Sequence, residues 1–514
     1  MTKEKKFLIY GICLVLFLLL GLTYAYFSSI VRGDKKKITV DTNDLKIVFD
    51  NGDDIEGTNI EPGWSITKTF SVENKTNYEY KYNLVFKDLI NTFVTKGYLV
   101  YKITSTDGGY SMIDYEDIPK STTLEDIIIK YSVAIASNTK HNYTLELKYI
   151  SDDDVDQSAD MEKEVSGKIF IEEGTDEPGV LVSSAILRDN PTVSERTDFS
   201  VTNTETTTGT IYKTNKTEDG SDVYYYSGNT TNNWVYFGGF YWRIIRTNED
   251  GGVRLLYSGT STDTEKGYLG STKFNTEYND LVYEGYMYGT SGSIDNNRTN
   301  ENDSTIKKYI DTWYENKLLT NYDKYISKTA IYCNDRSYDS KYEYVTSKVV
   351  YYGSYTRLVD NKTPSYKCGT NPSGGLFESV QAIADKFSAS TTGGGNGKLK
   401  YPIALATADE LVFAGGKTGT KLTSPYAWYY LNSEGNSITG NSWIWLLSPR
   451  RWTGSGATIW LAGGTANSGN LSDGRSDYAY YVARPAISLA SCVLVTGTGT
   501  PTNPYIVDEV NSNC

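Results

Sequence analysis

Histidine is almost absent from this chain. The 514 residues contain one histidine, His141, and five cysteines, and 50 basic side chains stand against 63 acidic ones. A zinc site built from several histidines is therefore excluded, and a Ser-His-Asp hydrolase would have to use His141. The formal net charge of −13 disfavours nucleic acid as a partner, because phosphates bind basic surfaces. The length predicts two to four globular domains.

Long apolar runs are missing after the first 30 residues. Residues 7–27 contain no charged side chain, and three of the first six residues are lysine. Such a run is long enough to cross a bilayer. It also fits a signal peptide that is cut between Ala25 and Tyr26. Residues 1–30 are therefore predicted to form a transmembrane or signal helix, which binds the membrane if it is not cleaved, and both alternatives place the remaining chain outside the cell membrane.

The cysteines agree with export. Four of them follow the apolar segment, and an even number in an exported chain indicates disulfides. Three pairings are possible, and we favour the two that join neighbours in sequence, Cys333 with Cys368 and Cys492 with Cys514. Four free thiols remain the alternative.

Residues 38–172 are predicted to form an all-β sandwich of about seven strands. Apolar and polar residues alternate over short runs such as WSITKTFSVEN, YLVYKITS and NYTLELKYI, separated by turn residues. The acidic run at 152–160 lacks the glycine and glutamate of a calcium-binding loop, so we interpret it as a solvated loop. His141 stands at the start of a strand and is expected to be exposed.

Several segments of this region resemble the TasA and camelysin family of exported Gram-positive proteins. They are T-Y-A-Y-F-S at 23–28, the following D-L-K-I, E-P-G-W-S-I-T-K-T-F-S-V-E-N at 61–74, and the later N-Y-T-L-E-L. The resemblance covers about 150 residues and implies a surface protein or a subunit of a matrix fibre. Some members are labelled metalloproteases, but no H-E-x-x-H motif occurs here.

The remainder divides into a connecting segment and an α+β domain. Residues 173–233 are rich in Thr and Asn, which predicts a linker or loosely packed strands leading into the next domain. Residues 234–514 begin with two strands around the turn Glu249–Gly252. Helices are predicted after a cap at Asp303 or Ser304, over residues 377–387, and after a capping box at Thr407 that ends at Gly415.

Four motifs in this last domain, in order along the chain, resemble a bacterial domain family that is similar to C-type lectins and to the formylglycine-generating, sulfatase-modifying fold. They are F-G-G-F-Y-W-R-I-I-R at 237–246, T-A-D-E-L at 407–411, W-I-W-L-L-S-P at 443–449 and V-A-R-P-A-I-S-L at 482–489. The match spans about 260 residues, and it implies a C-type-lectin-like fold. The function of the family is mostly unassigned.

Few residues suggest catalysis or cofactor binding. The glycine-rich runs at 393–398 and 416–418 lack the residues of a phosphate-binding loop, and the calcium-binding triplets of sugar-binding C-type lectins are absent. Cys492 and Cys514 flank the last strand instead of forming a close reactive pair. We therefore expect no cofactor, no metal and no enzymatic activity, with a formylglycine-generating-like enzyme as the least favoured alternative.

The stretch between the last two motifs has the composition of a recognition surface. Arginines supply forked hydrogen-bond donors, aromatic residues supply rigid contact area, and Gly, Ser and Asn supply adaptable hydrogen bonding. Arg484 is expected to be a buried structural donor, and Trp443, Trp445 and Trp460 could belong to the core. The candidate ligand face comprises Arg450, Arg451, Trp452, Trp460, Asn467, Asn470, Arg475, Asp477 and Tyr478.

These observations predict a non-catalytic binding protein that is secreted or held at the surface of a Gram-positive-type bacterium. The sandwich would be a stalk, and the lectin-like domain would bind an extracellular protein or glycan. In the main alternative the sandwich assembles with copies of itself into a matrix fibre by strand addition. A retargetable binder with a diversified face is a further alternative.

Overall fold

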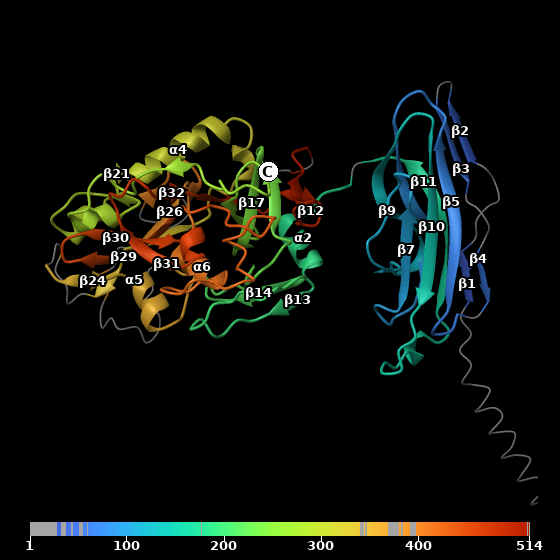
Figure 1. The fold of residues 1–514 in the computed structure, drawn as a ribbon, viewed down its shortest axis with the longest axis horizontal. Coiled ribbons are helices and arrows are strands. Elements are labelled where there is room, and N and C mark those ends of the chain that lie inside the picture. Colours follow the sequence, from blue (N-terminus) through green and yellow to red (C-terminus); the bar gives the residue numbers. More distant parts are fainter. Residues whose placement is uncertain are drawn as a thin grey trace, which may run out of the picture. The chain divides into compact units, whose positions relative to one another are not determined.

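The computed structural model describes residues 28–31, 38–42, 45–50, 55–58, 60–175, 177–339, 344, 347–368, 380–381, 384–390, 397–510, 512 and 514. The apolar segment 7–27 and the cleavage site at Ala25 and Tyr26 lie outside these residues. Among the described helices, none is long and apolar enough to span a membrane. The chain divides into two compact units, Met1–Glu177 and Pro178–Cys514, and strands dominate both (Figure 1).

The first unit is a β-sandwich, as the alternating pattern predicts, but its described residues form eleven strands instead of about seven. One sheet has the order β4 (Ile55–Thr58), β1 (Ser28–Val31), β11 (Glu164–Glu173), β6 (Tyr80–Asn91) and β9 (Ser121–Ile135). The other has the order β2 (Ile38–Thr42), β3 (Leu45–Asp50), β5 (Ser65–Asn74), β10 (Thr139–Tyr149), β7 (Leu99–Ser105) and β8 (Glu116–Asp117). The pairing of β1 with β11 is parallel.

Alternation along β10 shows how the sandwich forms its core. His141, Tyr143, Leu145, Leu147 and Tyr149 are buried, while the residues between them are not. The expectation that His141 is exposed is therefore wrong, because His141 is in phase with these inward-facing residues and only 5% of it is exposed.

The second unit contains an eleven-stranded sheet built around a hairpin. Its main path is β12 (Val180–Leu181), β34 (Leu494–Thr496), β35 (Tyr505–Val507), β16 (Trp234–Phe237), β17 (Phe240–Thr247), β15 (Val223–Tyr225), β14 (Thr210–Thr214) and β13 (Thr192–Ser194). β18 (Val253–Tyr257) pairs with β17 and with β33 (Pro485–Leu489), which pairs with β28 (Ile403–Leu405). Gly238 and Gly239 join β16 to β17 with positive φ values of 64° and 80°, which a two-residue hairpin turn requires.

A six-stranded sheet contains most of the candidate ligand face. Its order is β19 (Gly270–Ser271), β32 (Val482–Ala483), β29 (Ile444–Thr453), β30 (Ala457–Ala462) and β31 (Leu471–Arg475), with β24 (Val349–Tyr351) also paired to β29. β29, β30 and β31 lie side by side in Figure 1. The smaller strands are β20 (Met287–Tyr288), β21 (Asn302–Asp303), β22 (Tyr332–Asp335), β23 (Tyr338–Asp339), β25 (Val380–Gln381), β26 (Ala384–Ser388) and β27 (Gly397–Lys398).

Two of the three predicted helices are confirmed. Ser304 caps α4 (Thr305–Lys317) by accepting a hydrogen bond from the Lys307 amide. Thr407 and Glu410 form the capping box of α6 (Ala408–Phe413), which ends before Gly415. The other helical segments are α2 (Val182–Asp189), α3 (Ile294–Asn297), α5 (Gly353–Tyr355), η1 (Ser158–Asp160), η2 (Leu281–Glu284), η3 (Asp323–Tyr325), η4 (Thr356–Asp360) and η5 (Thr465–Asn467).

The helix predicted over residues 377–387 is wrong where the structure describes it. Val380–Gln381 and Ala384–Ser388 are strands β25 and β26. β26 pairs with β22, where Phe387 lies opposite Tyr332. Pairing with a strand 50 residues earlier in the chain overrides a local helical spacing, because both Phe387 and Tyr332 are buried in the core this way.

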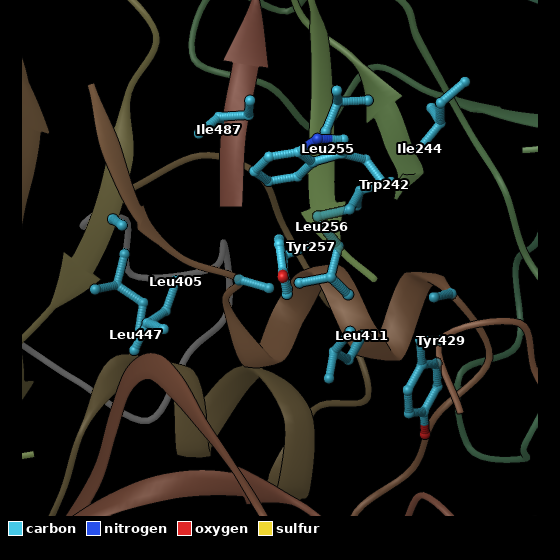
Figure 2. Packing of buried hydrophobic residues seen from close by; sticks show 14 of the residues in the cluster. Trp242, Ile244, Leu255, Leu256, Tyr257, Leu405, Leu411, Tyr429, Leu447 and Ile487 are labelled. Atoms are coloured by element: carbon cyan, nitrogen blue, oxygen red, sulfur yellow. The ribbon is translucent and has the colours of Figure 1, made fainter. Parts of the chain in front are cut away.

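One large apolar core holds the second unit together. Figure 2 shows Trp242 and Leu255 of the β17–β18 hairpin gathered with Ile487 of β33, and Leu411 of α6 in the same cluster. Residues of the segment predicted to be a linker or loosely packed strands also belong to this core, including Val182, Ile186 and Phe199. This segment is therefore an integral part of the second unit from Pro178 onward.

Two disulfides confirm the favoured pairing of the cysteines. Cys333 is bonded to Cys368, and Cys492 is bonded to Cys514. Disulfides persist in oxidising compartments, so they indicate an oxidising, extracellular environment for this unit.

Candidate functional site

A row of side chains crosses four strands of the six-stranded sheet. Tyr351 on β24 lies opposite Arg451 on β29, Arg451 lies opposite Thr458 on β30, and Thr458 lies opposite Arg475 on β31. Directly opposed residues of antiparallel strands share one face of the sheet. The register therefore places Tyr351, Arg451 and Arg475 on a common face.

A third arginine, Arg450, reaches the same face through an irregularity in β29. The register of β29 against β30 shifts between Pro449 and Arg451, which leaves Arg450 without a directly opposed residue. Its Nη1 lies 2.9 Å from Oδ1 of Asp473, while Nε of Arg451 lies 3.2 Å from the other oxygen of that carboxylate. Asp473 on β31 therefore holds both arginines in place.

Aromatic rings flank the arginines on both sides. The rings of Tyr351 and Tyr355 are stacked with their centroids 4.1 Å apart, and the guanidinium of Arg450 lies 5.2 Å from the centroid of Tyr355. On the other side, the guanidinium of Arg475 lies 3.9 Å from the centroid of Tyr278 and 4.9 Å from that of Tyr478.

Arg475 is further oriented by a bidentate ion pair. Its Nε and Nη2 donate to the two carboxylate oxygens of Asp477 at 2.6 and 3.1 Å. Hydrogen bonding to this carboxylate raises the pKa of Arg475. Burial lowers the pKa of Arg450, with Asp473 opposing the shift. The site therefore presents fixed guanidinium groups between aromatic planes.

We call this surface the arginine–tyrosine face. Five of the nine residues predicted from the sequence belong to it, and four residues that the sequence analysis missed join them. The predicted members are Arg450, Arg451, Arg475, Asp477 and Tyr478, and the added members are Tyr278, Tyr351, Tyr355 and Asp473. Asp473 could have been found as the residue two positions before Arg475 on one strand, whereas the tyrosines are brought in only by tertiary structure.

The structure buries the two tryptophans of the predicted face, so their assignment as surface contacts is wrong. Trp460 is fully buried, lies beneath Arg450 at 4.8 Å and donates from Nε1 to Oγ of Ser354 at 3.0 Å. Trp452 is 3% exposed and packs with Tyr338 and Val350 in a separate apolar cluster. Trp452 follows Arg451 directly, and successive residues of a strand point to opposite faces.

Asn467 and Asn470 lie apart from the arginines. Both are half-buried in the connection from β30 to β31, at the end of that hairpin opposite to Arg475. Four residues of β31 separate this end from Arg475, which corresponds to about 13 Å along a strand. The structure therefore places these two candidate residues in the connection between two strands of the sheet and does not bring them together with the face.

Arg484 has the structural role expected from its sequence context. It is buried and donates to the carbonyls of Tyr257 and Tyr429 at 2.6 and 2.7 Å and to Oγ of Ser258 at 3.0 Å. Among the residues that the structure describes, no cluster of three or more His, Cys, Asp or Glu side chains is placed to hold a metal ion.

Comparison with known proteins assigns neither a family nor a function. No protein-family model matches the chain, and no curated protein matches it. Among solved structures, the chain has a weak likeness to a family 123 glycoside hydrolase from Clostridium perfringens, from a study of glycolipid glycan hydrolysis. The two share 11% sequence identity over 25% of this chain and 26% of the hydrolase, with a TM-score of 0.11. At that level the likeness carries no structural argument.

Proposed function

We propose that the chain is a non-catalytic binding protein of a bacterial cell surface, and that its second unit recognises an extracellular protein or glycan through the arginine–tyrosine face. The observation that carries the proposal is the row from Tyr351 through Arg451 to Arg475, which a rigid antiparallel sheet holds in register. Guanidinium groups and tyrosine rings on a fixed scaffold supply directional hydrogen bonds and contact area at little cost in conformational entropy.

The charges of the face favour an acidic group on the ligand. Three arginines share two carboxylates, Asp473 and Asp477, so the face retains an excess of one positive charge on a chain whose net charge is −13. In the described contacts, Arg451 donates through Nε, and Arg475 donates through Nε and Nη2. Each guanidinium therefore uses only one of its edges. Their remaining donors suit a carboxylate or sulfate of a partner.

The resemblances in sequence support the same proposal. The lectin-like motifs imply a fold whose loop-rich face is used for recognition, and the TasA-like segments imply export and a place at the cell surface of a Gram-positive-type bacterium. The sandwich would then serve as a stalk. The two disulfides support an extracellular location.

A panel of surface glycans and proteins tests the proposal with the full chain. We expect saturable binding to at least one acidic panel member, weakened at least tenfold in the double variant Arg451→Ala/Arg475→Ala. A matched control, Arg298→Ala/Lys400→Ala, also removes two positive charges from exposed ion pairs and should bind as the wild type does. Equal loss in both double variants, or no binding to any member, would contradict the proposal.

A structural role in a fibre is favoured by one specific observation. β9 is fifteen residues long, pairs with β6 alone among the described strands, and forms an edge of its sheet. Leu124 on this edge is 67% exposed. A long edge strand with exposed apolar residues is a template for strand addition by a second copy of the chain.

Electron microscopy tests the fibre role. If the chain assembles through β9, the wild type should form filaments and Leu124→Lys should not, because a charge on the edge strand opposes strand addition. Ile113→Lys is the control, since Ile113 is an exposed apolar residue of the same unit that lies outside the edge strand. Filaments formed equally by both variants would contradict assembly through β9.

A further inference from the structure

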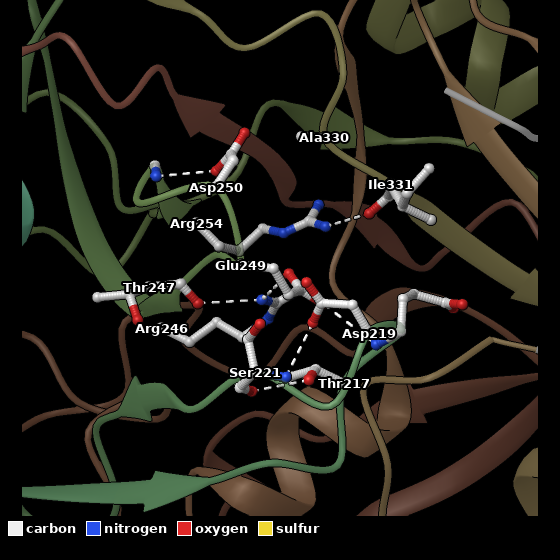
Figure 3. Close-up of polar contacts among 12 residues, drawn as sticks. Thr217, Asp219, Ser221, Arg246, Thr247, Glu249, Asp250, Arg254, Ala330 and Ile331 are labelled. Atoms are coloured by element: carbon white, nitrogen blue, oxygen red, sulfur yellow. Dashed lines mark hydrogen bonds and ion pairs between the residues drawn. The ribbon is translucent and has the colours of Figure 1, made fainter. Parts of the chain in front are cut away.

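A cavity of about 240 Å³ lies within the second unit, and its lining combines charged, polar and apolar side chains. It is separate from the arginine–tyrosine face, since none of the residues of that face lines it. Arg246 at the end of β17 and Arg254 on β18 contribute guanidinium groups to its wall, and Figure 3 shows Arg254 between Ile331 on one side and Arg246 with Glu249 on the other. At about 30 Å³ for each water, the cavity has room for about eight water molecules.

The two guanidinium groups converge on the carboxylate of Glu410. Its Oε1 lies 3.4 Å from Nε of Arg254 and 3.8 Å from Nε of Arg246, while its Oε2 accepts a hydrogen bond from the Thr407 amide in the capping box of α6. In the described contacts, Arg246 donates hydrogen bonds only through Nη1, to Thr247 and Glu249, and Arg254 only through Nη2, to the carbonyl of Ile331. Both arginines therefore keep unused donors at the cavity.

Buried polar atoms without a hydrogen-bond partner are concentrated at this cavity. Within the described part of the chain, these atoms include Nε of Arg246, Nε of Arg254, both amide atoms of Asn248 and the hydroxyl of Tyr366. All four side chains are at least nine-tenths buried and line the cavity. Both Nε atoms face Glu410 at ion-pair distances of 3.8 and 3.4 Å without a hydrogen bond to it. A buried polar group without a hydrogen-bond partner is destabilising, so such a cluster favours a polar occupant of the cavity.

The balance of charges narrows the chemistry of the occupant. Arg246, Arg254 and Arg357 face seven carboxylates in the lining, which disfavours an anion. The lining carboxylates are Glu218, Asp219, Glu249, Asp250, Asp335, Asp409 and Glu410. Most of the unpartnered atoms are donors, which disfavours a cation. A neutral molecule with several hydroxyl or carbonyl oxygens fits both conditions.

One part of the remaining wall is apolar, and the other part carries the hydroxyl groups of Thr329, Ser365, Thr407 and Ser448. Ala330, Ile331 and the disulfide-bonded Cys333 line the apolar part. A ligand with one apolar face and a polar edge matches this division. We propose that the cavity is a binding site for a neutral, sugar-sized polyhydroxylated molecule, with its hydroxyl groups on Arg246, Arg254, Asn248 and Tyr366 and its carbon face on Ala330 and Ile331.

Isothermal titration of the full chain tests this site with five probes: D-glucose, D-galactose, N-acetyl-D-glucosamine, citrate as an anion and spermidine as a cation. We expect saturable binding of at least one of the sugars, with one site per chain. The variants Tyr366→Phe and Asn248→Ala should each weaken it roughly three- to tenfold, the effect of one lost hydrogen bond. Both variants remove atoms without partners, so both should fold at least as well as the wild type.

Tyr338→Phe is the matched control. Tyr338 is also a buried tyrosine whose hydroxyl has no partner within the described residues, but it packs with Val350 and Trp452 outside the cavity lining. The Tyr338→Phe variant should bind the sugar with the same affinity as the wild type. Binding of citrate or spermidine alone, failure of all three sugars to saturate, or unchanged affinity in both Tyr366→Phe and Asn248→Ala would overturn the proposal. This site and the surface face are tested by different variants, so one can fail without the other.

Discussion

Arg450 lies over the buried indole of Trp460, with the guanidinium carbon 4.8 Å from the ring centroid. Because Asp473 holds the same guanidinium at 2.9 Å, the three side chains form one packed unit beneath the arginine–tyrosine face. We expect Arg450→Ala to destabilise the second unit by about 1–2 kcal/mol, from the lost cation–π contact and the partly buried ion pair. Urea unfolding measures this, and an unchanged midpoint would show that Arg450 does not support the face.

A buried arginine braces three segments of the second unit. Arg357 donates from Nη1 to Asp335 at 2.6 Å and from Nε and Nη2 to Asp409 at 2.9 and 3.1 Å. Removing Arg357 leaves the buried carboxylates of Asp335 and Asp409 without their counter-charge. Arg357→Ala should therefore lower the free energy of unfolding by about 3–5 kcal/mol. Lys400→Ala, which breaks the exposed pair with Glu315, should leave the unfolding midpoint close to that of the wild type, because solvent screens an exposed ion pair. Denaturant unfolding of the two variants makes the comparison, and similar losses would contradict the brace.

The disulfide between Cys333 and Cys368 should contribute strongly to stability. It closes a loop with a sequence separation of 35 residues, for which the loop-entropy relation gives about 3–4 kcal/mol. The double variant Cys333→Ala/Cys368→Ala is expected to unfold at correspondingly lower guanidinium concentration. Reductant should lower the stability of the wild type further than that of this variant, which retains only Cys492–Cys514. A variant as stable as the oxidised wild type would refute this contribution.

The single histidine makes the sandwich sensitive to acid. Nδ1 of His141 lies 2.9 Å from the hydroxyl of Tyr82, and burial lowers the pKa of His141 below its usual 6.5, although Asp107 opposes the shift. His141 therefore binds a proton more readily in the unfolded chain than in the folded chain. The stability contributed by neutral His141 is complete above pH 6.5 and is lost as the pH falls toward the lower pKa of the folded state.

Unfolding midpoints of the sandwich measured from pH 8 to pH 5.5 test this dependence. The wild type should lose stability below pH 6.5, and His141→Gln should lose less over the same interval. The difference between the two curves isolates His141, because the chain contains no other histidine. Parallel curves would show that His141 does not titrate on unfolding.

Local patterns in the sequence predict the elements whose own residues decide their structure. The caps at Ser304 and Thr407 are of this kind, since each cap side chain and the amide that it accepts from lie within three residues. Alternation in β10 is also a local signal, because every second side chain of a strand faces the same core. The strand β26 is not predicted in this way, because its helical spacing yields to pairing with β22. Pairing between distant segments leaves no local signal.

The candidate face also combines features that have a local signal in the sequence with features that depend on distant segments. Alternation alone places Trp452 on the side of the sheet opposite to Arg451, so its burial could have been predicted. Trp460 shares its face with Asp473, as their direct opposition shows, and it is buried because Arg450 covers it. The tyrosines at 351 and 355 precede that arginine by about 100 residues, and only the folded chain brings them together.

Two matched tyrosines offer the most direct test of recognition through the arginine–tyrosine face. Tyr478 on the face is 41% exposed, and Tyr236 on β16 outside it is 39% exposed. The measurement is the dissociation constant of the full chain for the tightest-binding member of the acidic glycan and protein panel. We expect Tyr478→Ala to weaken binding by about tenfold or more and Tyr236→Ala to leave it within about twofold. Equal affinities of the two variants would contradict the account.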